Sequence, residues 1–430
     1  MIKSLTLWHI TPADLGLEFL DPSDTVLSAD EKLYKLVNDP TIKIDKHSYS
    51  KKDYEYLLLM RNFLHKVHSS LKEPTYFSRE FPNVEGCIAK FVVTDRIACY
   101  ILLCGIVVFF EMGEKIAVED ENYFSLNAFY ERQLYEDDYC SNPECTSRKK
   151  PIYDFLDLLW DCVEKKEFIY SSSTNYGNHG IPYTLCITMI DDPELVSNNI
   201  DLQTKKNIRA LIETSAFNNI LQKDHWELIK KRIDDDDIRD LKIQELSENL
   251  IFVDSWSGVL LAGDLSGNET CLRWFIEFEI FLQAHWLLFD AYCENVSRIE
   301  MSPIQLQGII NRAEVIKITL DNNISCNVEQ SRLIMHKSLI QSSNINTIYQ
   351  RMYGMVSNKL RMKLLNAEKE KNRFALLSDI SLLIIAVLQI YSVILDFLVK
   401  DTFGKSDLIS IAITLGICAT CIWIMIKGKQ

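Results

Sequence analysis

The sequence is short of basic residues. It holds 46 Lys and Arg against 60 Asp and Glu, which gives a formal net charge of −14. Residues 374–430 carry four bases and four acids, so the negative charge lies entirely in the part of the chain before them. Nonspecific binding to nucleic acid needs a basic surface. The composition therefore argues against nonspecific binding to nucleic acid, and no direct nucleic-acid binding is expected. It favours partners that are cations, or ligands held at a local exception to the overall field.

Other signatures are also missing. The twelve cysteines are scattered from Cys87 to Cys421 without a dense disulfide framework, and the first 19 residues hold no long apolar run. These absences predict no signal peptide, free thiols, and a reducing, cytosolic location for the bulk of the chain. The sequence has no nucleophile elbow, HExxH motif or protein-kinase motif set, so we expect that the protein is not an enzyme.

Charge is absent from two runs near the C-terminus. Ile380–Leu395 has 16 uncharged residues and Leu408–Ile426 has 19. A membrane-spanning helix needs about 20 residues at a rise of about 1.5 Å each. We therefore predict a transmembrane hairpin, with helices at 374–399 and 408–427 and an outer loop at 400–407. A pair of buried core helices is the alternative interpretation.

Basic residues set the expected orientation of this hairpin. Basic residues favour the cytoplasmic side of a membrane. Six of them precede the first run, and two follow the second run, one just before the 428–430 tip and one within it. They are Lys359, Arg361, Lys363, Lys369, Lys371 and Arg373, then Lys427 and Lys429. Both termini are therefore expected in the cytoplasm of a prokaryotic cell, with the protein in its inner membrane.

Polar residues of the first run share one helical face. Ser378, Ser381, Gln389, Ser392 and Asp396 follow at spacings of 3, 8, 3 and 4, as on a helix. One interpretation is that Asp396 reaches the outer headgroup region. The other is a pore lined by Ser381, Gln389, Ser392 and Asp396, with Asp396 as a cation-selecting acidic ring. Because one hairpin cannot enclose a pore, the second interpretation requires an oligomer.

A long helix is predicted to lead into the membrane. Asn344–Val399 contains no proline and a single glycine, Gly354, where a break is the open alternative. Apolar residues recur there with helical period. Before it, Asn268–Arg298 reads as a buried helix with Asn268 as its N-cap. Residues 268–373 are therefore assigned to a helical stalk.

Residues 1–267 alternate between strand-like and helix-like runs, which predicts a cytosolic α/β domain with a mixed sheet and helices. Expected strands are Leu5–His9, Ile88–Val93, Cys99–Phe110 (as two strands hinged at Gly105), Thr184–Ile190, Leu250–Val253 and Val259–Ala262. Expected helices are Lys51–Leu71, Tyr153–Lys166, Lys205–Asn219 and Ile238–Glu248.

Three stretches of this domain are candidate ligand sites. The carboxylates Asp234, Asp235, Asp236 and Asp237 suit a divalent cation, or else form a solvated acidic loop that caps a helix. The loop Ser171–Tyr183 offers polar groups for a nucleotide at Asn175, Tyr176, Asn178 and His179. The glycine-rich stretch Asp254–Glu269 offers a second wall at Trp256. A plain connection is the alternative for both loops.

An α/β domain, a long helix that continues into the membrane, a short outer loop and a second span together resemble the CorA magnesium-channel superfamily. The resemblance implies a homopentamer in the lipid bilayer, with the first span lining the pore and Mg²⁺ as its cation. That family carries Gly-Met-Asn after the first span. Here the outer loop reads Thr402-Phe403-Gly404-Lys405-Ser406, so Phe403 and Gly404 remain while Lys405 adds positive charge.

Two alternatives to a gated cation channel stay open. Divergent CorA-like proteins act as membrane effectors in antiviral defence, including type III CRISPR systems, where a nucleotide second messenger opens the membrane part. The other alternative is a membrane-tethered sensor without a pore.

Overall fold

The computed structural model describes residues 4–14, 38–39, 41–44, 51–71, 81–84, 86–102, 105–113, 115–117, 150–162, 184–192, 244–247, 250–255, 258–298, 300–322 and 330–399, with Ile409, Ala412 and Gly416. The chain divides into two compact units, Met1–Ser357 and Asn358–Gln430.

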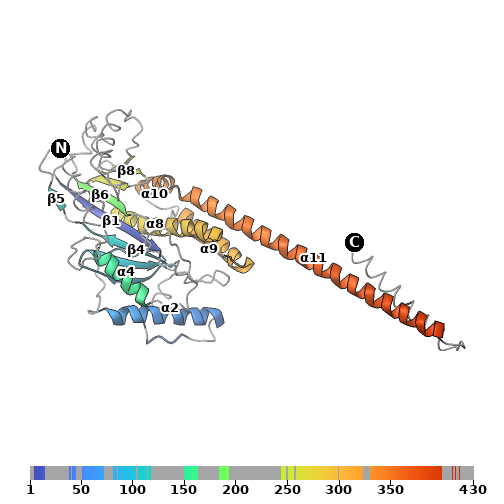
Figure 1. Ribbon diagram of the computed structural model, residues 1–430. Helices are drawn as coiled ribbons and strands as arrows, with labels where there is room; N and C mark the ends of the chain where they lie inside the picture. Colours follow the sequence, from blue (N-terminus) through green and yellow to red (C-terminus); the bar gives the residue numbers. More distant parts are fainter. Residues whose placement is uncertain are drawn as a thin grey trace, which may run out of the picture. The chain divides into compact units, whose positions relative to one another are not determined.

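Nine strands of the described residues form one mixed sheet in the order β2-β3-β4-β1-β6-β9-β8-β7, with β5 also paired to β1 (Figure 1). Within this sheet β6 and β9 are parallel, and the other neighbouring strands described here pair antiparallel. The strands are β1 (Ser4–Asp14), β2 (Cys87–Val92), β3 (Ile97–Leu102), β4 (Ile106–Glu111), β5 (Lys115–Ala117), β6 (Leu185–Asp191), β7 (Gln244–Ser247), β8 (Leu250–Ser255) and β9 (Gly258–Gly263).

Strand β1 occupies the centre of the sheet. On one side its C-terminal half pairs with β4 and its first residues pair with β5. On the other side it pairs with β6 through Thr6–Ile10. The parallel step from β6 to β9 needs a crossover connection, and the residues between them include the 193–243 stretch that lies outside the described residues.

One face of the sheet is covered by α2 (Lys51–Ser70) and α4 (Lys150–Cys162) (Figure 1). Alternate strand residues such as Cys99, Ile101 and Phe109 pack with both helices in one buried apolar cluster. Phe155 of α4 contacts both Phe91 and Phe109, with ring centroids 5.7 and 6.2 Å apart. Because successive side chains of a strand point to opposite faces of the sheet, the residues between these ones lie on the other face.

The other face carries α8 (Glu269–Arg298), which packs against β1 and β4. Two further helices follow, α9 (Pro303–Asn322) and α10 (Gln330–Ser342), and both contact α8. Ser302 and Gln305 form a capping box at the start of α9, with hydrogen bonds of 2.8 and 3.3 Å between backbone and side chain. Pro303 then occupies the first helical position, which needs no N–H donor.

The last described helix is α11 (Ile345–Val399), with 55 residues. Asn344 precedes it with φ of 53°, a left-handed conformation that asparagine tolerates better than most residues. Its carbonyl accepts the N–H groups of Thr347 and Ile348 at 2.9 and 3.2 Å. A single tight turn at residues 343–344 therefore joins α10 to α11.

Most of the expected elements that fall on described residues are confirmed. The mixed α/β domain is present, the two strands β3 and β4 meet at Gly105, and α11 passes Gly354 without a break. Asn268 is at the N-cap position of α8, because its carbonyl accepts the Leu272 N–H at 3.0 Å. The expected helix Lys205–Asn219 lies outside the described residues.

The helix expected at Ile238–Glu248 is wrong over its described part, because Gln244–Ser247 is strand β7. It pairs antiparallel with β8, with Gln244 opposite Phe252. Strand β8 is buried and its outer edge needs hydrogen-bond partners. This tertiary requirement overrides the helical preference of the local sequence.

Two glycines provide a matched test of the backbone. Gly105 has φ of 85°, so Gly105→Ala should lower the free energy of unfolding by about 1–2 kcal/mol. Gly354 lies inside α11 and an added Cβ there meets nothing within 4 Å, so Gly354→Ala should raise it by up to about 1 kcal/mol. Denaturant unfolding of the purified protein measures both. Equal effects of the two substitutions would contradict the assigned backbone conformations.

Candidate membrane segment and buried polar groups

Helix α11 changes character along its length. Near its start Ile345, Met352 and Val356 are buried, and Tyr349 contacts Phe289 of α8 with ring centroids 5.6 Å apart. At about 1.5 Å per residue the helix is about 82 Å long. It therefore begins inside the core of the first compact unit and continues through the second.

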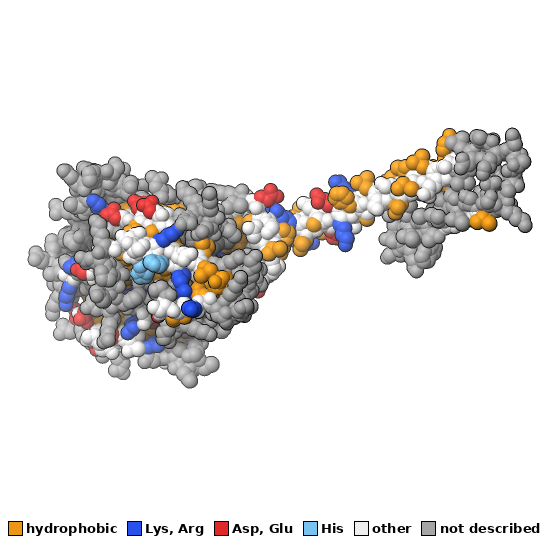
Figure 2. All heavy atoms as spheres, turned by 90° about the horizontal axis from the view of Figure 1, so that it is seen from below, with side chains coloured by type: hydrophobic (Ala, Val, Ile, Leu, Met, Phe, Trp, Pro, Cys, Tyr) orange, Lys and Arg blue, Asp and Glu red, His pale blue; other side chains and the backbone are white. Residues whose placement is uncertain are grey.

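From Phe374 to Tyr391 the large apolar side chains of α11 are mostly exposed, with exposed fractions between 44% and 70%. Figure 2 shows these side chains along the C-terminal part of the helix, after a stretch that carries both Lys or Arg and Asp or Glu. Among the described residues, one helix is long and apolar enough to cross a membrane, and it is this one. A contiguous apolar surface of this kind marks an interaction with lipid or with another protein surface.

The energetics of membrane insertion are favourable for this segment. Residues 374–395 include fourteen Leu, Ile, Phe and Val residues. At about 0.3–0.6 kcal/mol each on insertion scales, they contribute roughly 4–8 kcal/mol in favour of the bilayer. One carboxylate at the centre of a span opposes this by about 2.5–3.5 kcal/mol. The apolar residues therefore outweigh the carboxylate inside this range, Asp379, and Asp396 follows directly after the range.

The polar residues of this segment fall on one side of α11. Because α11 is helical throughout, Ser378, Ser381, Gln389, Ser392 and Asp396 lie within an arc of about 80° at about 100° per residue. The side chains of the first four are exposed. Ser381 donates its hydroxyl to the Leu377 carbonyl at 2.8 Å, so its donor is satisfied within the helix and its oxygen still offers lone pairs.

The other predicted site residues are only partly placed. Asp396 lies in the last turn of α11, in the register of the polar stripe. The remaining ones lie outside the described residues: Phe403, Gly404 and Lys405 of the loop, Asn175, Tyr176, Asn178, His179 and Trp256, and Asp234, Asp235, Asp236 and Asp237. Among the described residues, no group of three or more His, Cys, Asp and Glu side chains could hold a metal ion.

The described end of the glycine-rich stretch is built as a helix entry. The Asp264 carboxylate accepts the Gly267 N–H at 2.8 Å and the Ser266 hydroxyl at 3.0 Å. Asn268 donates its side-chain amide to the Asp264 carbonyl at 2.7 Å. A carboxylate thus occupies the position where a phosphate at the N-terminus of α8 would bind, which argues against a phosphate site there.

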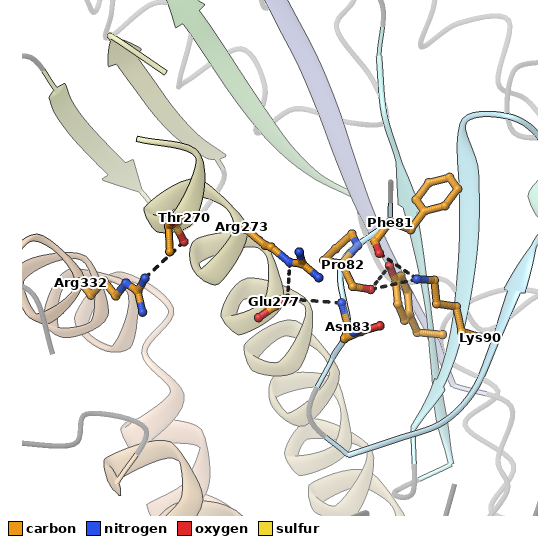
Figure 3. A network of polar contacts seen from close by, with 9 residues as sticks. Phe81, Pro82, Asn83, Lys90, Thr270, Arg273, Glu277 and Arg332 are labelled. Carbon is orange, nitrogen blue, oxygen red and sulfur yellow. Dashed lines mark hydrogen bonds and ion pairs between the residues drawn. The ribbon is translucent and has the colours of Figure 1, made fainter. Parts of the chain in front are cut away.

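Figure 3 shows a second polar cluster beside α8, formed by residues that the sequence did not single out. Lys90 is buried and donates to the carbonyls of Phe81 and Pro82 at 2.8 and 3.3 Å. Burial lowers the pKa of Lys90. Because its amine is directed at backbone carbonyls, Lys90 fixes the segment before β2 and offers no site for a ligand.

The same figure shows how α8 is held at its N-terminal half. Arg273 and Glu277 form an ion pair at 3.2 Å, and Glu277 also accepts the Asn83 N–H at 3.3 Å. Arg332 of α10 donates to the carbonyl of Thr270 at 3.5 Å. These contacts tie α8 to the segment before β2 on one side and to α10 on the other.

A pair of carboxylates was also missed by sequence reasoning. Glu279 of α8 is only 2% exposed; burial, and to a smaller extent the charge of Asp254 in β8, raise its pKa to about 7. The hint in the sequence is that two acidic residues, Glu277 and Glu279, interrupt the apolar run "FIEFEIF" at 275–281. Asp254 lies 25 residues before Glu279 in the sequence.

Comparisons with protein-family models, with curated proteins and with solved structures give no match to this chain.

A charge placed in the apolar segment tests its membrane role. Leu383→Arg should sharply reduce the fraction of protein in washed membranes, because an arginine at the centre of a span costs about 2.5–3.5 kcal/mol. Ile318→Arg is the matched control, since Ile318 of α9 is 58% exposed and lies outside the segment. Alkaline extraction of membranes followed by immunoblotting measures both. Equal membrane fractions for the two variants would exclude this segment as the membrane attachment.

Proposed function

We propose that the protein is an oligomeric membrane channel or transporter for cations whose α/β domain controls the membrane helices. One observation carries this proposal. A single unbroken helix begins in the core of the α/β unit and ends as an exposed apolar segment with polar residues on one side. A movement at the start of such a helix is transmitted along it without a flexible joint.

The polar stripe favours a pore over a simple tether. A helix surrounded only by lipid gains nothing from Gln389 and three serines in one arc, since polar groups are unfavourable in hydrocarbon. Several copies arranged around one axis would direct these groups toward a water-filled centre and the leucines toward lipid. A homo-oligomer, with five copies as in the CorA-like proteins that the chain resembles, meets this requirement.

The second span belongs to the same proposal. Leu408–Ile426 is long enough to return across the bilayer. The basic residues before Phe374 and after Ile426 then both face the cytoplasm, and the loop with Phe403, Gly404 and Lys405 faces outward. Asp396 lies at the outer end of the first span, where a ring of carboxylates favours cations. Lys405 opposes that field, so the selectivity of CorA for Mg²⁺ is not carried over.

A substitution in the polar stripe tests the pore. Gln389→Leu should lower cation flux through proteoliposomes by about tenfold, because an apolar constriction adds a barrier of about 1.4 kcal/mol or more. Val387→Leu is the matched control, since Val387 lies on the opposite side of α11 and is 56% exposed. Its flux should equal that of the wild type. Equal loss in both variants would indicate disturbed packing, and unchanged flux in Gln389→Leu would remove this face from the conduction path.

The acidic ring has its own test. Asp396→Asn should reduce the preference for cations over anions while flux persists, because it removes one negative charge per copy at the outer mouth. Reversal potentials under a salt gradient measure the preference. An unchanged reversal potential would assign Asp396 to the headgroup region. Flux that appears only after addition of a nucleotide extract from phage-challenged cells would identify an antiviral effector.

A further inference from the structure

The charge of the chain changes sign within α11, just before the exposed apolar segment. Residues 1–357 hold 36 bases and 54 acids, a net charge of −18, and residues 374–430 have no net charge. Residues 358–373, which we call the basic neck, hold six bases and two acids, a net charge of +4. The neck is therefore a basic exception in an acidic protein, and it lies next to the candidate membrane segment.

The six bases of the neck surround the helix. Because α11 is helical throughout and each residue turns by about 100°, the largest gap between neighbouring bases around the axis is about 80°. A folded partner protein contacts one face of a helix. A lipid surface that the helix crosses meets all of its faces. The distribution of the bases therefore favours lipid over a protein partner.

The bases fall into two groups by their height along α11. The upper bases, Lys369, Lys371 and Arg373, lie within about 8 Å of the level of Phe374 at about 1.5 Å per residue. The headgroup layer on each side of a bilayer is about 5–8 Å thick, and charges are screened over about 8 Å at physiological ionic strength. The upper bases are thus within reach of lipid phosphates when Phe374 lies at the membrane surface.

The lower bases of the neck lie too far from that level. They are about 16–22 Å before Phe374 along the helix, which is about two screening lengths or more. They are Lys359, Arg361 and Lys363. The two groups carry the same charge on the same helix and differ in height, so they form a matched pair for experiment.

The upper bases are available to an anion. All three are exposed. Glu368 precedes Lys371 and Glu370 precedes Arg373 by three residues, a spacing that allows ion pairs on a helix. Among the described residues, however, the structure pairs none of the upper bases with an acidic side chain. The two glutamates weaken the attraction for anions and still leave this level of the helix with a net charge of +1.

We propose that the upper bases bind the headgroups of anionic phospholipids in the inner leaflet, so that the protein selects anionic over zwitterionic lipids around α11. The inference rests on the proposed function, because it requires α11 to enter the bilayer. A basic stretch directly before a span is attracted to anionic lipid, and each Lys or Arg near the surface strengthens binding by about fivefold. The long side chains of Lys and Arg let their charges reach the phosphates.

Lipid competition on the full-length protein tests the proposal. Detergent-solubilised protein is mixed with equal amounts of phosphatidylglycerol and phosphatidylethanolamine and recaptured, and mass spectrometry quantifies both retained lipids. The wild type should retain an excess of phosphatidylglycerol. Substitution of the three upper bases by Gln should lower the ratio of the two lipids by about tenfold or more. Substitution of the three lower bases by Gln removes the same charge and should leave the ratio unchanged.

A variant with the opposite sign excludes a general loss of structure. Glu368→Gln combined with Glu370→Gln should raise the ratio by about fivefold or more, because it removes two negative charges from the level of the upper bases. Both glutamates are exposed, so the helix is expected to be retained. Lipid exchange in about 1 M salt should abolish the preference of the wild type, because the screening length falls to about 3 Å.

Three results would overturn the proposal. Retention of both lipids by the wild type without a preference, or an equal loss of preference in the two triple variants, would refute the lipid contact and leave the membrane helix in place. An unchanged ratio in the upper-base variant, with a smaller oligomer by light scattering, would assign these bases to a contact between protein chains. Retention of neither lipid by the wild type would refute the membrane role of α11, and this inference with it.

Discussion

The exposed apolar turns of α11 are the constraint on which the rest of the structure depends. Between Phe374 and Tyr391 the helix satisfies its own backbone hydrogen bonds, which is the condition for entering a bilayer. Its large side chains are mostly exposed and have to be covered by lipid or by other copies. A soluble core cannot fill this role within the described residues, since the segment that meets the length and hydropathy of a membrane span is unburied there. The proposal that α11 enters a membrane starts from this requirement.

Helix α8 links the sheet to the helices that precede the membrane segment. It packs against β1 and β4, contacts α10 through Cys271 and Met335 at 3.6 Å, and touches α11 through Phe289 and Tyr349. Its 30 residues are apolar around much of the circumference, because it is covered on several sides. The few polar side chains on its buried surface therefore carry disproportionate weight. Among them, burial raises the pKa of Glu279 to about 7.

The sequence predicted those features that arise from local pattern. Alternation and turn residues located most strands, and the absence of proline from 344–399 located α11 almost to the residue. The helix expected at Ile238–Glu248 was wrong in its described part because β7 is set by the open edge of β8, a property of the assembled sheet. Helix α10 was not predicted. The influence of the Asp254 charge on Glu279 was missed because strand β8 and helix α8 are separated along the chain by β9 and a turn.

The junction between α10 and α11 decides how far an event in the α/β domain can travel. Residues 343–344 form one tight turn, in which Ser343 donates to the Leu339 carbonyl at 3.0 Å and the Asn344 carbonyl accepts the first N–H groups of α11. Such a turn transmits rotation because it lacks the slack of a longer loop. Ile345, at the first position of α11, is also buried, so α11 cannot pivot freely there. A change in the position of α10 on the sheet is therefore expected to shift the start of α11.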